Sequence, residues 1–469
     1  DAVRGSLFRF KGLGSDSFFT PFRRVGLAPL FGVASSPVNS GAEEMKKALF
    51  VLVCLVAWGG FVFFTAFYGL WMNPVVERGD EEAFISYATD KIDADTRGNT
   101  ALVLLRDGAP YATHFSDTNA QVNGDTVFSL ASLSKWFAAY SVLQLAQNGE
   151  LNLDAPVQAQ LSRWQLPESD FDLDGVTART LLSHTAGLND GLGFGDYSRD
   201  ESLPTLESSL AAPRASGGRS VEIALTAAPG EQWNYSGGGY LILELLVEET
   251  TGMTFADYLK EAVFEPLGMR RTGYDFIESY DNNAGSYALD GARAKSYRYA
   301  SNAATAMVSS TNDLARFVQH LVADPALPRD YESQRGRPLL TAESLTQMRE
   351  PHGYALGAAI WGLGAILYAP VDDDFVYGHD GVNDPAINSS VRIDPTTCDA
   401  FIALTTGHPT LASNLGSDWV LWQTGVPDVL VSDAVIQSML RPFALGAGLI
   451  LLLWAWVARR GRGQGVRPL

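Results

Sequence analysis

"SLASLSK", residues 129–135, stands directly before a long apolar run and holds three serines and one lysine. The run that follows has apolar side chains at helical spacing and ends at Asn148–Gly149, which predicts a helix. Ser132 and Lys135 are three positions apart, so both side chains lie on one face of that helix. A serine hydroxyl needs a base to act as a nucleophile, and a buried lysine can lose its proton near neutral pH. The stretch therefore predicts a nucleophile and its base.

Taken alone, S-x-x-K is a weak signal, because serines before a helix also fit N-capping and turn roles. Two downstream segments strengthen the chemical interpretation. "PGEQWNYSGGGY" (229–240) places Tyr235 between a Pro-Gly turn and a glycine cluster, where it can relay a proton; the alternative is a core aromatic beside a tight turn. "VYGHDG" (376–381) ends a predicted strand on His379, where backbone N–H groups can face an oxyanion; the alternative is a hydrogen-bonded strand-end histidine.

The order of expected elements predicts an α+β fold. An acidic amphipathic helix (80–95) and a hairpin around an Asp-Gly turn (100–115) come first, residues 150–320 look mainly helical, with loops, and strand patterns return from residue 355. We expect a sheet built from both ends of this region with a helical insertion between them. The loop 189–220, rich in Gly, Asp and Ser, is expected to border a cleft.

Six segments in a fixed order resemble the serine β-lactamase-like, penicillin-recognising family, most of all its class C, D-alanyl-D-alanine carboxypeptidase and esterase branch. The resemblance covers about 80–410 and implies an antiparallel sheet flanked by helices plus a helical insertion domain. The segments are "SLASLSK", "LLSHTAGL" (181–188), "PGEQWNYSGGGY", "EPLGMRRTGY" (265–274), "MVSSTNDLARF" (307–317) and "YGHDG".

The resemblance implies a role for individual residues. Ser132 matches the acylated nucleophile, Lys135 its general base, and Tyr235 the tyrosine that shuttles the proton with the lysine. His184 matches a family residue that looks structural.

The strand segment His379–Asp380–Gly381 matches the family's Lys-Thr-Gly element, and the backbone N–H groups of Ser132 and Val382 match the oxyanion hole. The chain departs from the family pattern at Gly237, where an Asn is usual, and at His379, where a Lys is usual. Both usual residues help to bind substrate in β-lactamases and peptidases, so strong β-lactamase activity is not expected.

Two uncharged apolar runs, residues 48–71 and 442–458, are each long enough to span a bilayer. Basic residues flank both runs, at Lys46–Lys47 and Arg459–Arg462, and such flanks stay in the cytoplasm. An uncleaved anchor is favoured over a cleaved signal peptide for the first run, and a membrane helix over a buried core helix for the second. The expected organisation is a tail or upstream extension (1–44), an N-terminal anchor (45–72), a catalytic domain (80–425), a C-terminal membrane helix (442–458) and a basic cytoplasmic tail (459–469).

Two interpretations of residues 1–44 stay open: an extension upstream of a natural start at Met45, or a genuine tail. The expected location is a bacterial inner membrane, with the catalytic domain facing the periplasm.

The charge of the chain excludes some partners. Residues 72–440 hold 22 basic and 49 acidic residues, a balance that repels nucleic acid. No CxxC pair or Cys/His cluster suggests a metal site, and no cofactor is expected. The expected partners are a small-molecule or short-peptide substrate and the lipid bilayer.

The leading hypothesis is a serine hydrolase that forms an acyl-enzyme and acts on an ester, an amide or a D-amino-acid peptide. The alternative is a catalytically weak sensor module that binds cell-wall peptide or penicillin; retention of Ser132, Lys135 and Tyr235 together argues against it. An α/β-hydrolase would need G-x-S-x-G, which does not occur in the chain.

Overall fold

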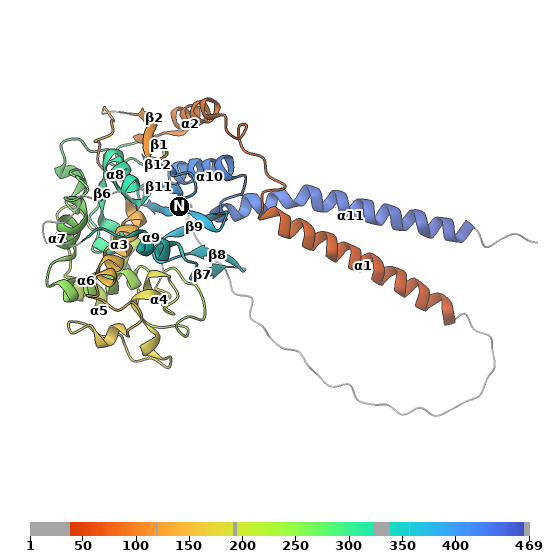
Figure 1. Ribbon diagram of the computed structural model, residues 1–469, viewed down its shortest axis with the longest axis horizontal. Coiled ribbons are helices and arrows are strands. Elements are labelled where there is room, and N and C mark those ends of the chain that lie inside the picture. The colour runs from red at the N-terminus through yellow and green to blue at the C-terminus, as the bar shows by residue number, and fades with distance from the viewer. Residues whose placement is uncertain (1–37, 119–120, 191–194, 323–337, 356, 464–469) are drawn as a thin grey trace, which may run out of the picture. The chain divides into compact units, whose positions relative to one another are not determined.

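The computed structural model, drawn in Figure 1, divides into two compact units, residues 1–54 and 55–469, and the second holds the sheet and the expected site. Residues 1–37 of the expected N-terminal tail lie outside the described part of the chain. Residues 464–469 of the expected basic C-terminal tail lie outside it as well. The structure describes residues 38–118, 121–190, 195–322, 338–355 and 357–463.

Eight antiparallel strands form one sheet in the order β2-β1-β12-β11-β10-β9-β8-β7, so strands from both ends of the domain meet where β1 pairs with β12. This confirms the expected sheet and the hairpin around Asp107–Gly108. The strands are β1 (Thr100–Arg106), β2 (Ala109–Ser116), β7 (Gly353–Ala355), β8 (Ala358–Trp361), β9 (Ile366–Val371), β10 (Asp374–Asn383), β11 (Ile387–Asp394) and β12 (Asp399–Thr406). Two small pairs join β3 (Phe128–Ser129) to β6 (Val308–Ser309) and β4 (Arg214–Ala215) to β5 (Arg219–Ser220).

Helices cover both faces of the sheet (Figure 1), because successive strand side chains point to opposite sides. Val103 packs into the core shared with α3 (Ser134–Gln147) and α6 (Gly238–Thr251). Leu102 and Leu104 pack into the core shared with α2 (Glu81–Asp95) and α10 (Leu411–Thr424). The remaining helices of the domain are α4 (Ala178–Leu182), α5 (Leu206–Ala211), α7 (Phe255–Leu259), α8 (Thr311–Val322) and α9 (Ala342–Arg349).

The segment 150–320 is less helical than expected. Its helices are separated by long irregular stretches, and between 265 and 301 the structure contains a single short 3₁₀ turn, Ile277–Ser279. This stretch is rich in Gly, Asp, Asn and Ser, which favour turns over helix. The loop 189–220 holds α5 and the β4–β5 pair, while its residues 191–194 lie outside the described part.

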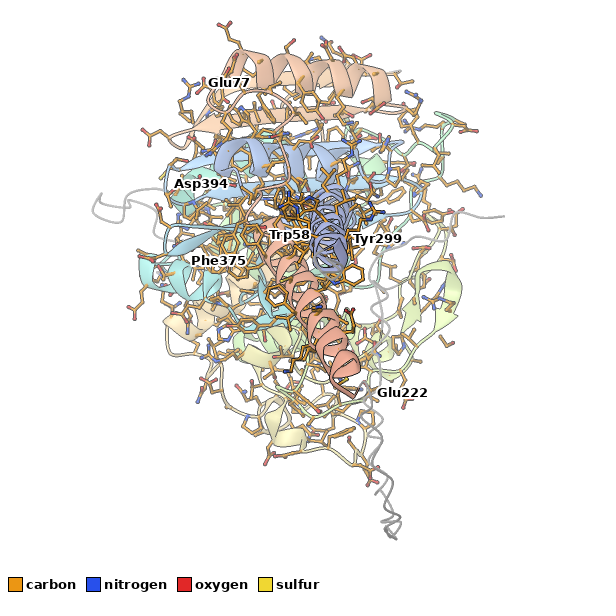
Figure 2. The ribbon with its side chains drawn as sticks, turned by 90° about the vertical axis from the view of Figure 1, so that its right-hand side faces the viewer. Trp58, Glu77, Glu222, Tyr299, Phe375 and Asp394 are labelled. Carbon is orange, nitrogen blue, oxygen red and sulfur yellow. The ribbon has the colours of Figure 1, made fainter. Side chains whose placement is uncertain are left out.

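Two long apolar helices, α1 (Val38–Ala66) and α11 (Ser432–Gly463), contain candidate membrane spans, Glu44–Ala66 and Val435–Arg460, by length and composition. The most apolar window of α11 has none of its residues buried, so α11 is not a core helix. The helix begins ten residues before the expected start at Pro442, because the chain stays helical across Arg441 and the proline. Trp58 of α1, labelled in Figure 2, donates its indole N–H to the Pro442 carbonyl at 3.2 Å.

Candidate active site

The turn that carries Ser132 leads directly into α3. It is a 3₁₀ turn, Ala131–Leu133, and Ala131 has a φ of 49°. Left-handed backbone at a non-glycine residue costs about 1–3 kcal/mol and is often found at functional sites. Ser134 is fully buried; its hydroxyl donates to the Ala131 carbonyl at 2.7 Å and accepts from the Met307 N–H at 3.2 Å. Ser134 therefore stabilises the turn, and half-buried Ser132 is the serine that faces Lys135.

The turn is fixed against the sheet by β10 and β11. Ser389 donates its hydroxyl to the Leu130 carbonyl at 2.7 Å, and a side chain at Gly381 would overlap that same oxygen. Only glycine lets β10 approach the backbone this closely. The glycine of "HDG" thus sets the distance between the Ser132 turn and the strand.

Lys135 lies in the first turn of α3 and is fully buried. Its Nζ donates to the Ala304 carbonyl at 2.9 Å and lies 3.4 Å from Ser132 Oγ. The rings of Tyr235 and Tyr240 lie 5.0 and 5.5 Å from Nζ. Burial lowers the pKa of Lys135 to about 7, although the negative charge of Asp190 acts to raise this pKa. Near neutral pH, part of the lysine population is a free amine beside a serine hydroxyl.

The carbonyl that holds Lys135 belongs to a π-helical turn, Asn302–Ala306. Buried Glu244 of α6 holds this turn: it accepts from the Ala303 N–H at 3.0 Å and from the Ser301 hydroxyl at 3.3 Å. Burial raises the pKa of Glu244 to about 8. Sequence reasoning missed this residue, because a lone glutamate within an apolar helix carries no motif.

Tyr235 precedes α6 and completes the group around Ser132. Its ring lies 4.4 Å from the ring of His184. Burial raises the pKa of Tyr235 well above its usual value, and the charge of Asp190 raises this pKa further. A hydrogen bond with Ser132 acts in the opposite direction and lowers the pKa. The phenol is therefore neutral at physiological pH and can pass a proton on without becoming a stable phenolate.

Asp190 is the second residue that sequence reasoning missed. Its carboxylate accepts from the Ser236 hydroxyl at 2.5 Å and from the N–H groups of Gly237 and Gly238 at 3.1 and 3.2 Å, at the N-terminus of α6. A side chain at Gly238 would come within 2.6 Å of this carboxylate, which explains the glycine at this position. The N–H of Gly237 is therefore engaged by Asp190, and a substrate contact of Gly237 stays a prediction.

His184 supports the Tyr235 segment. Its carbonyl accepts from the Asn234 N–H at 2.8 Å and its Nδ1 accepts from the Ser236 N–H at 3.1 Å. Burial, with the nearby Lys135, holds its pKa well below the usual range. These contacts match the structural role expected for His184.

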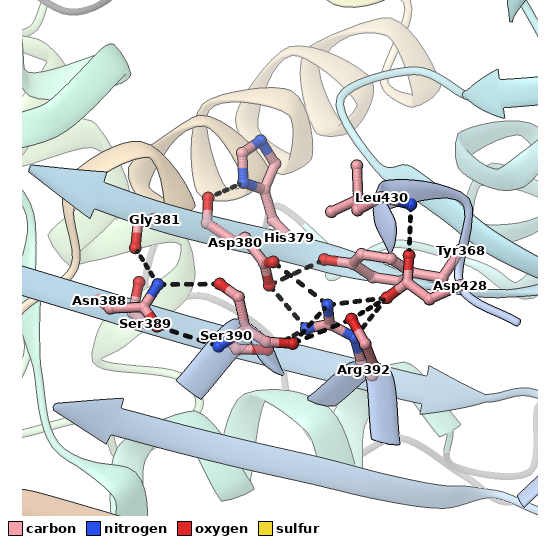
Figure 3. Close-up of polar contacts among 12 residues, drawn as sticks. Tyr368, His379, Asp380, Gly381, Asn388, Ser389, Ser390, Arg392, Asp428 and Leu430 are labelled. Carbon is pink, nitrogen blue, oxygen red and sulfur yellow. Dashed lines mark hydrogen bonds and ion pairs between the residues drawn. The ribbon is translucent and has the colours of Figure 1, made fainter. Parts of the chain in front are cut away.

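The strand β10 presents alternate side chains to opposite faces. His379 and Gly381 face the Ser132 turn, whereas Asp380 points to the other side, where it pairs with Arg392 at 2.7 and 3.2 Å and accepts from the Tyr368 hydroxyl at 3.1 Å (Figure 3). The Asp380 side chain therefore points away from the Ser132 turn, and a substrate contact of this residue stays a prediction. Val382 follows Gly381 and is in register with Asn388 of β11; its oxyanion role stays a prediction.

The His379 imidazole is buried, with its ring 5.4 Å from that of Trp361. Burial and the nearby charge of Lys135 lower its pKa to about 3, so the ring is neutral where the family pattern has a lysine. Among the described residues, no group of three or more His, Cys, Asp or Glu side chains is arranged to hold a metal ion.

The comparisons with known proteins agree on the type of domain. A family model described as Beta-lactamase matches residues 85–425. Penicillin-binding protein 4* of Bacillus subtilis is 33% identical over 176 residues, 36% of this chain and 37% of that protein. Esterase EstB of Burkholderia gladioli is 36% identical over 170 residues, 32% of this chain and 39% of that protein. The matches thus span less than two fifths of the length of these two relatives.

Solved structures show the same fold at lower identity. The penicillin-binding protein homologue from Pyrococcus abyssi has a TM-score of 0.57 at 22% identity, covering 73% of this chain and 76% of its own. D-amino acid amidase from Ochrobactrum anthropi SV3 has a TM-score of 0.53 at 22% identity, covering 77% and 98%. At this identity the likeness establishes the fold alone.

Proposed function

This chain belongs to the Beta-lactamase family, and we propose that it is a membrane-anchored serine hydrolase that forms an acyl-enzyme on Ser132. The observation that carries the proposal is Lys135: a fully buried amine with a pKa of about 7, 3.4 Å from the Ser132 hydroxyl. A lysine in water keeps its proton at neutral pH and cannot serve as a base.

The proposed reaction has two steps. In the first, Ser132 Oγ forms a bond to the substrate carbonyl carbon while Lys135 takes the hydroxyl proton. The bond to the leaving group then breaks as Tyr235 delivers a proton to it and receives the proton held by Lys135. In the second, water attacks the acyl carbon and its proton passes through Tyr235 and Lys135 to Ser132 Oγ. The bond between Oγ and the acyl carbon breaks, which releases the carboxylic acid and restores the Ser132 hydroxyl. The backbone N–H groups of Ser132 and Val382 stabilise the oxyanion in both steps.

The substrate class we propose is an ester, an amide or a D-amino-acid peptide. The relatives' names include an esterase, penicillin-binding proteins and a D-amino acid amidase, which supports acyl transfer without choosing among these substrates. A neutral His379 replaces the usual Lys, and Gly237, whose N–H is bonded to Asp190, replaces the usual Asn. Because both usual residues help to bind substrate in β-lactamases, we expect slow hydrolysis of β-lactams.

We further propose the inner membrane of a bacterium as the location, with the catalytic domain, about 80–425, in the periplasm. Two candidate spans of 23 and 26 residues support this, and exposed apolar side chains such as Leu445 and Leu452 would be costly in water. The basic residues at one end of each span, Lys46–Lys47 and Arg459–Arg460, support a cytoplasmic location for both of these ends.

Hydrolysis by the full chain, purified in detergent, tests the proposal. The substrates are a short-chain aryl ester, a D-Ala-D-Ala peptide, a D-amino-acid amide and a chromogenic cephalosporin. We expect turnover of at least one and a loss of at least about 1,000-fold in kcat/KM in Ser132→Ala. Ser129→Ala, three residues away in β3, is the matched control and should keep the activity. Binding of the peptide or the cephalosporin without turnover would instead favour a silent sensor module.

A further inference from the structure

The hydrogen bond of His379 determines which of its ring nitrogens carries the proton. Nδ1 lies 2.6 Å from the backbone carbonyl oxygen of Asp380. A carbonyl oxygen only accepts, so Nδ1 must be the donor. In a neutral imidazole the other nitrogen, Nε2, then carries a lone pair and is an acceptor.

This acceptor has no hydrogen-bond partner among the described residues, although His379 is 1% exposed. Buried polar groups in folded proteins are nearly always paired, and an unpaired one beside a candidate active site is expected where a ligand supplies the partner. A substrate can pair with Nε2 only through a donor of its own.

The imidazole faces the candidate active site and not the interior of the sheet. It lies on the same side of β10 as Gly381, whose backbone abuts the Ser132 turn, and opposite to Asp380 (Figure 3). Trp361 connects it to the site, because the Trp361 ring lies 5.4 Å from that of His379 and 5.7 Å from that of Tyr235.

His184 shows that a ring nitrogen without a hydrogen-bond partner is not by itself sufficient to indicate a substrate contact. Its Nδ1 accepts from the Ser236 N–H, so its Nε2 carries the proton, the opposite tautomer. This Nε2 is also without a hydrogen-bond partner among the described residues. However, the ring packs against Tyr235, Tyr240 and Trp361 at 4.4 to 5.2 Å, where it supports the tyrosine.

We propose that Nε2 of His379 is a specificity-determining acceptor: it selects substrates that present an N–H or O–H donor beside the scissile bond, such as a carboxamide, and disfavours those that present a carboxylate there. The inference rests on the proposed acylation of Ser132. A carboxylate would place a second acceptor and a negative charge against a buried lone pair, leaving both unpaired.

Two fluorophosphonate probes that differ only in a terminal carboxamide or carboxylate test this inference on the full chain in detergent. The second-order rate of Ser132 labelling is read by mass spectrometry of the tryptic peptide. We expect the carboxamide probe to react roughly 10- to 100-fold faster with the wild type. His379→Lys should reverse the preference by supplying a cation, whereas His114→Lys, which adds the same charge at a site distant in sequence, should leave it unchanged.

The wild-type comparison does not depend on how His379→Lys folds. The specificity inference would be overturned if both probes labelled Ser132 equally fast, or if the carboxylate probe labelled it faster. Either result would leave the proposed hydrolase function intact. Failure of both probes to label Ser132 would contradict the proposed function itself, and the inference with it.

Discussion

The proton affinity of one side chain, Lys135, decides whether the proposed chemistry works at neutral pH. Its ammonium form loses hydration on burial, and this outweighs the attraction of Asp190, so its pKa falls to about 7. The aromatic faces of Tyr235 and Tyr240 partly compensate for the lost water when the lysine is charged. The site therefore holds a base that is available at pH 7 and still able to return a proton.

The pH dependence of kcat/KM follows from this pKa. Below pH 7 Lys135 is protonated and cannot accept the Ser132 proton, so kcat/KM should fall with decreasing pH, approaching roughly tenfold per pH unit in the acid range. The pKa of His379 is lowered to about 3, so this ring stays neutral through the range, and burial also lowers the pKa of His184. A pH profile that is flat from pH 5 to 8 with a non-ionising ester would contradict Lys135 as the base.

Asp190→Asn should move the acid limb of this profile to lower pH. The substitution removes a negative charge that raises the pKa of Lys135 while keeping the size of the side chain. The pH profile of kcat/KM measures the shift, and a melting curve of the same variant checks that α6 keeps its N-terminal contacts. An acid limb that stays in place or moves to higher pH would show that Asp190 does not act on the base.

These residues differ in how far sequence could predict them. Ser132, Lys135 and Tyr235 stand in recognisable segments, and the structure brings them together. Asp190 and Glu244 are isolated acids whose partners are backbone N–H groups and serine hydroxyls far along the chain, so no local pattern marks them. The side chain of Asp380 lies on the face of β10 opposite to that of His379, because only the first and third side chains of a three-residue strand segment share a face.

At the scale of elements, the site is the junction between the Ser132 turn and β10. The sheet and its crossing from β1 to β12 were predictable from alternating apolar patterns near both ends of the domain. The irregular stretches between 150 and 320 were not, because their packing depends on long-range hydrogen bonds such as those of Glu244 and Asp190.

Gly381→Ala should disturb this junction. The added methyl group would overlap the Leu130 carbonyl and push the Ser132 turn away from β10, so we expect kcat/KM to fall by about 100-fold. Gly448→Ala is the matched control: it has nothing within 4 Å of the new methyl group and should leave the activity unchanged. Wild-type activity in Gly381→Ala would mean that the close approach does not position Ser132.

At the scale of the whole molecule, a buried ionic cluster connects the site strand to the segment before α11 (Figure 3). Arg392 of β11 is fully buried and pairs with both Asp380 and Asp428, and Asp428 also accepts from the Leu430 N–H at 2.8 Å. Sequence could not predict this cluster, because its three charges lie on separate elements and resemble ordinary surface residues.

Arg392→Met should destabilise the fold by about 3–5 kcal/mol, because it leaves two carboxylates in the interior without their cation. The exposed pair Arg199–Glu278, 3.7 Å apart, offers the control, and Arg199→Met should change the free energy of unfolding by less than about 1 kcal/mol. Denaturant unfolding of both variants measures the difference. Equal stability of the two variants would mean that the cluster is not what holds β11 to this segment.

Fluorophosphonate labelling of the full chain, with the modified residue located by mass spectrometry, tests the central claim most directly. The proposed acyl-enzyme mechanism predicts a single label on Ser132, absent in Ser132→Ala, retained in Ser129→Ala, and formed more slowly below pH 7. Full labelling of Ser132→Ala, or a label on another serine of the wild type, would contradict it.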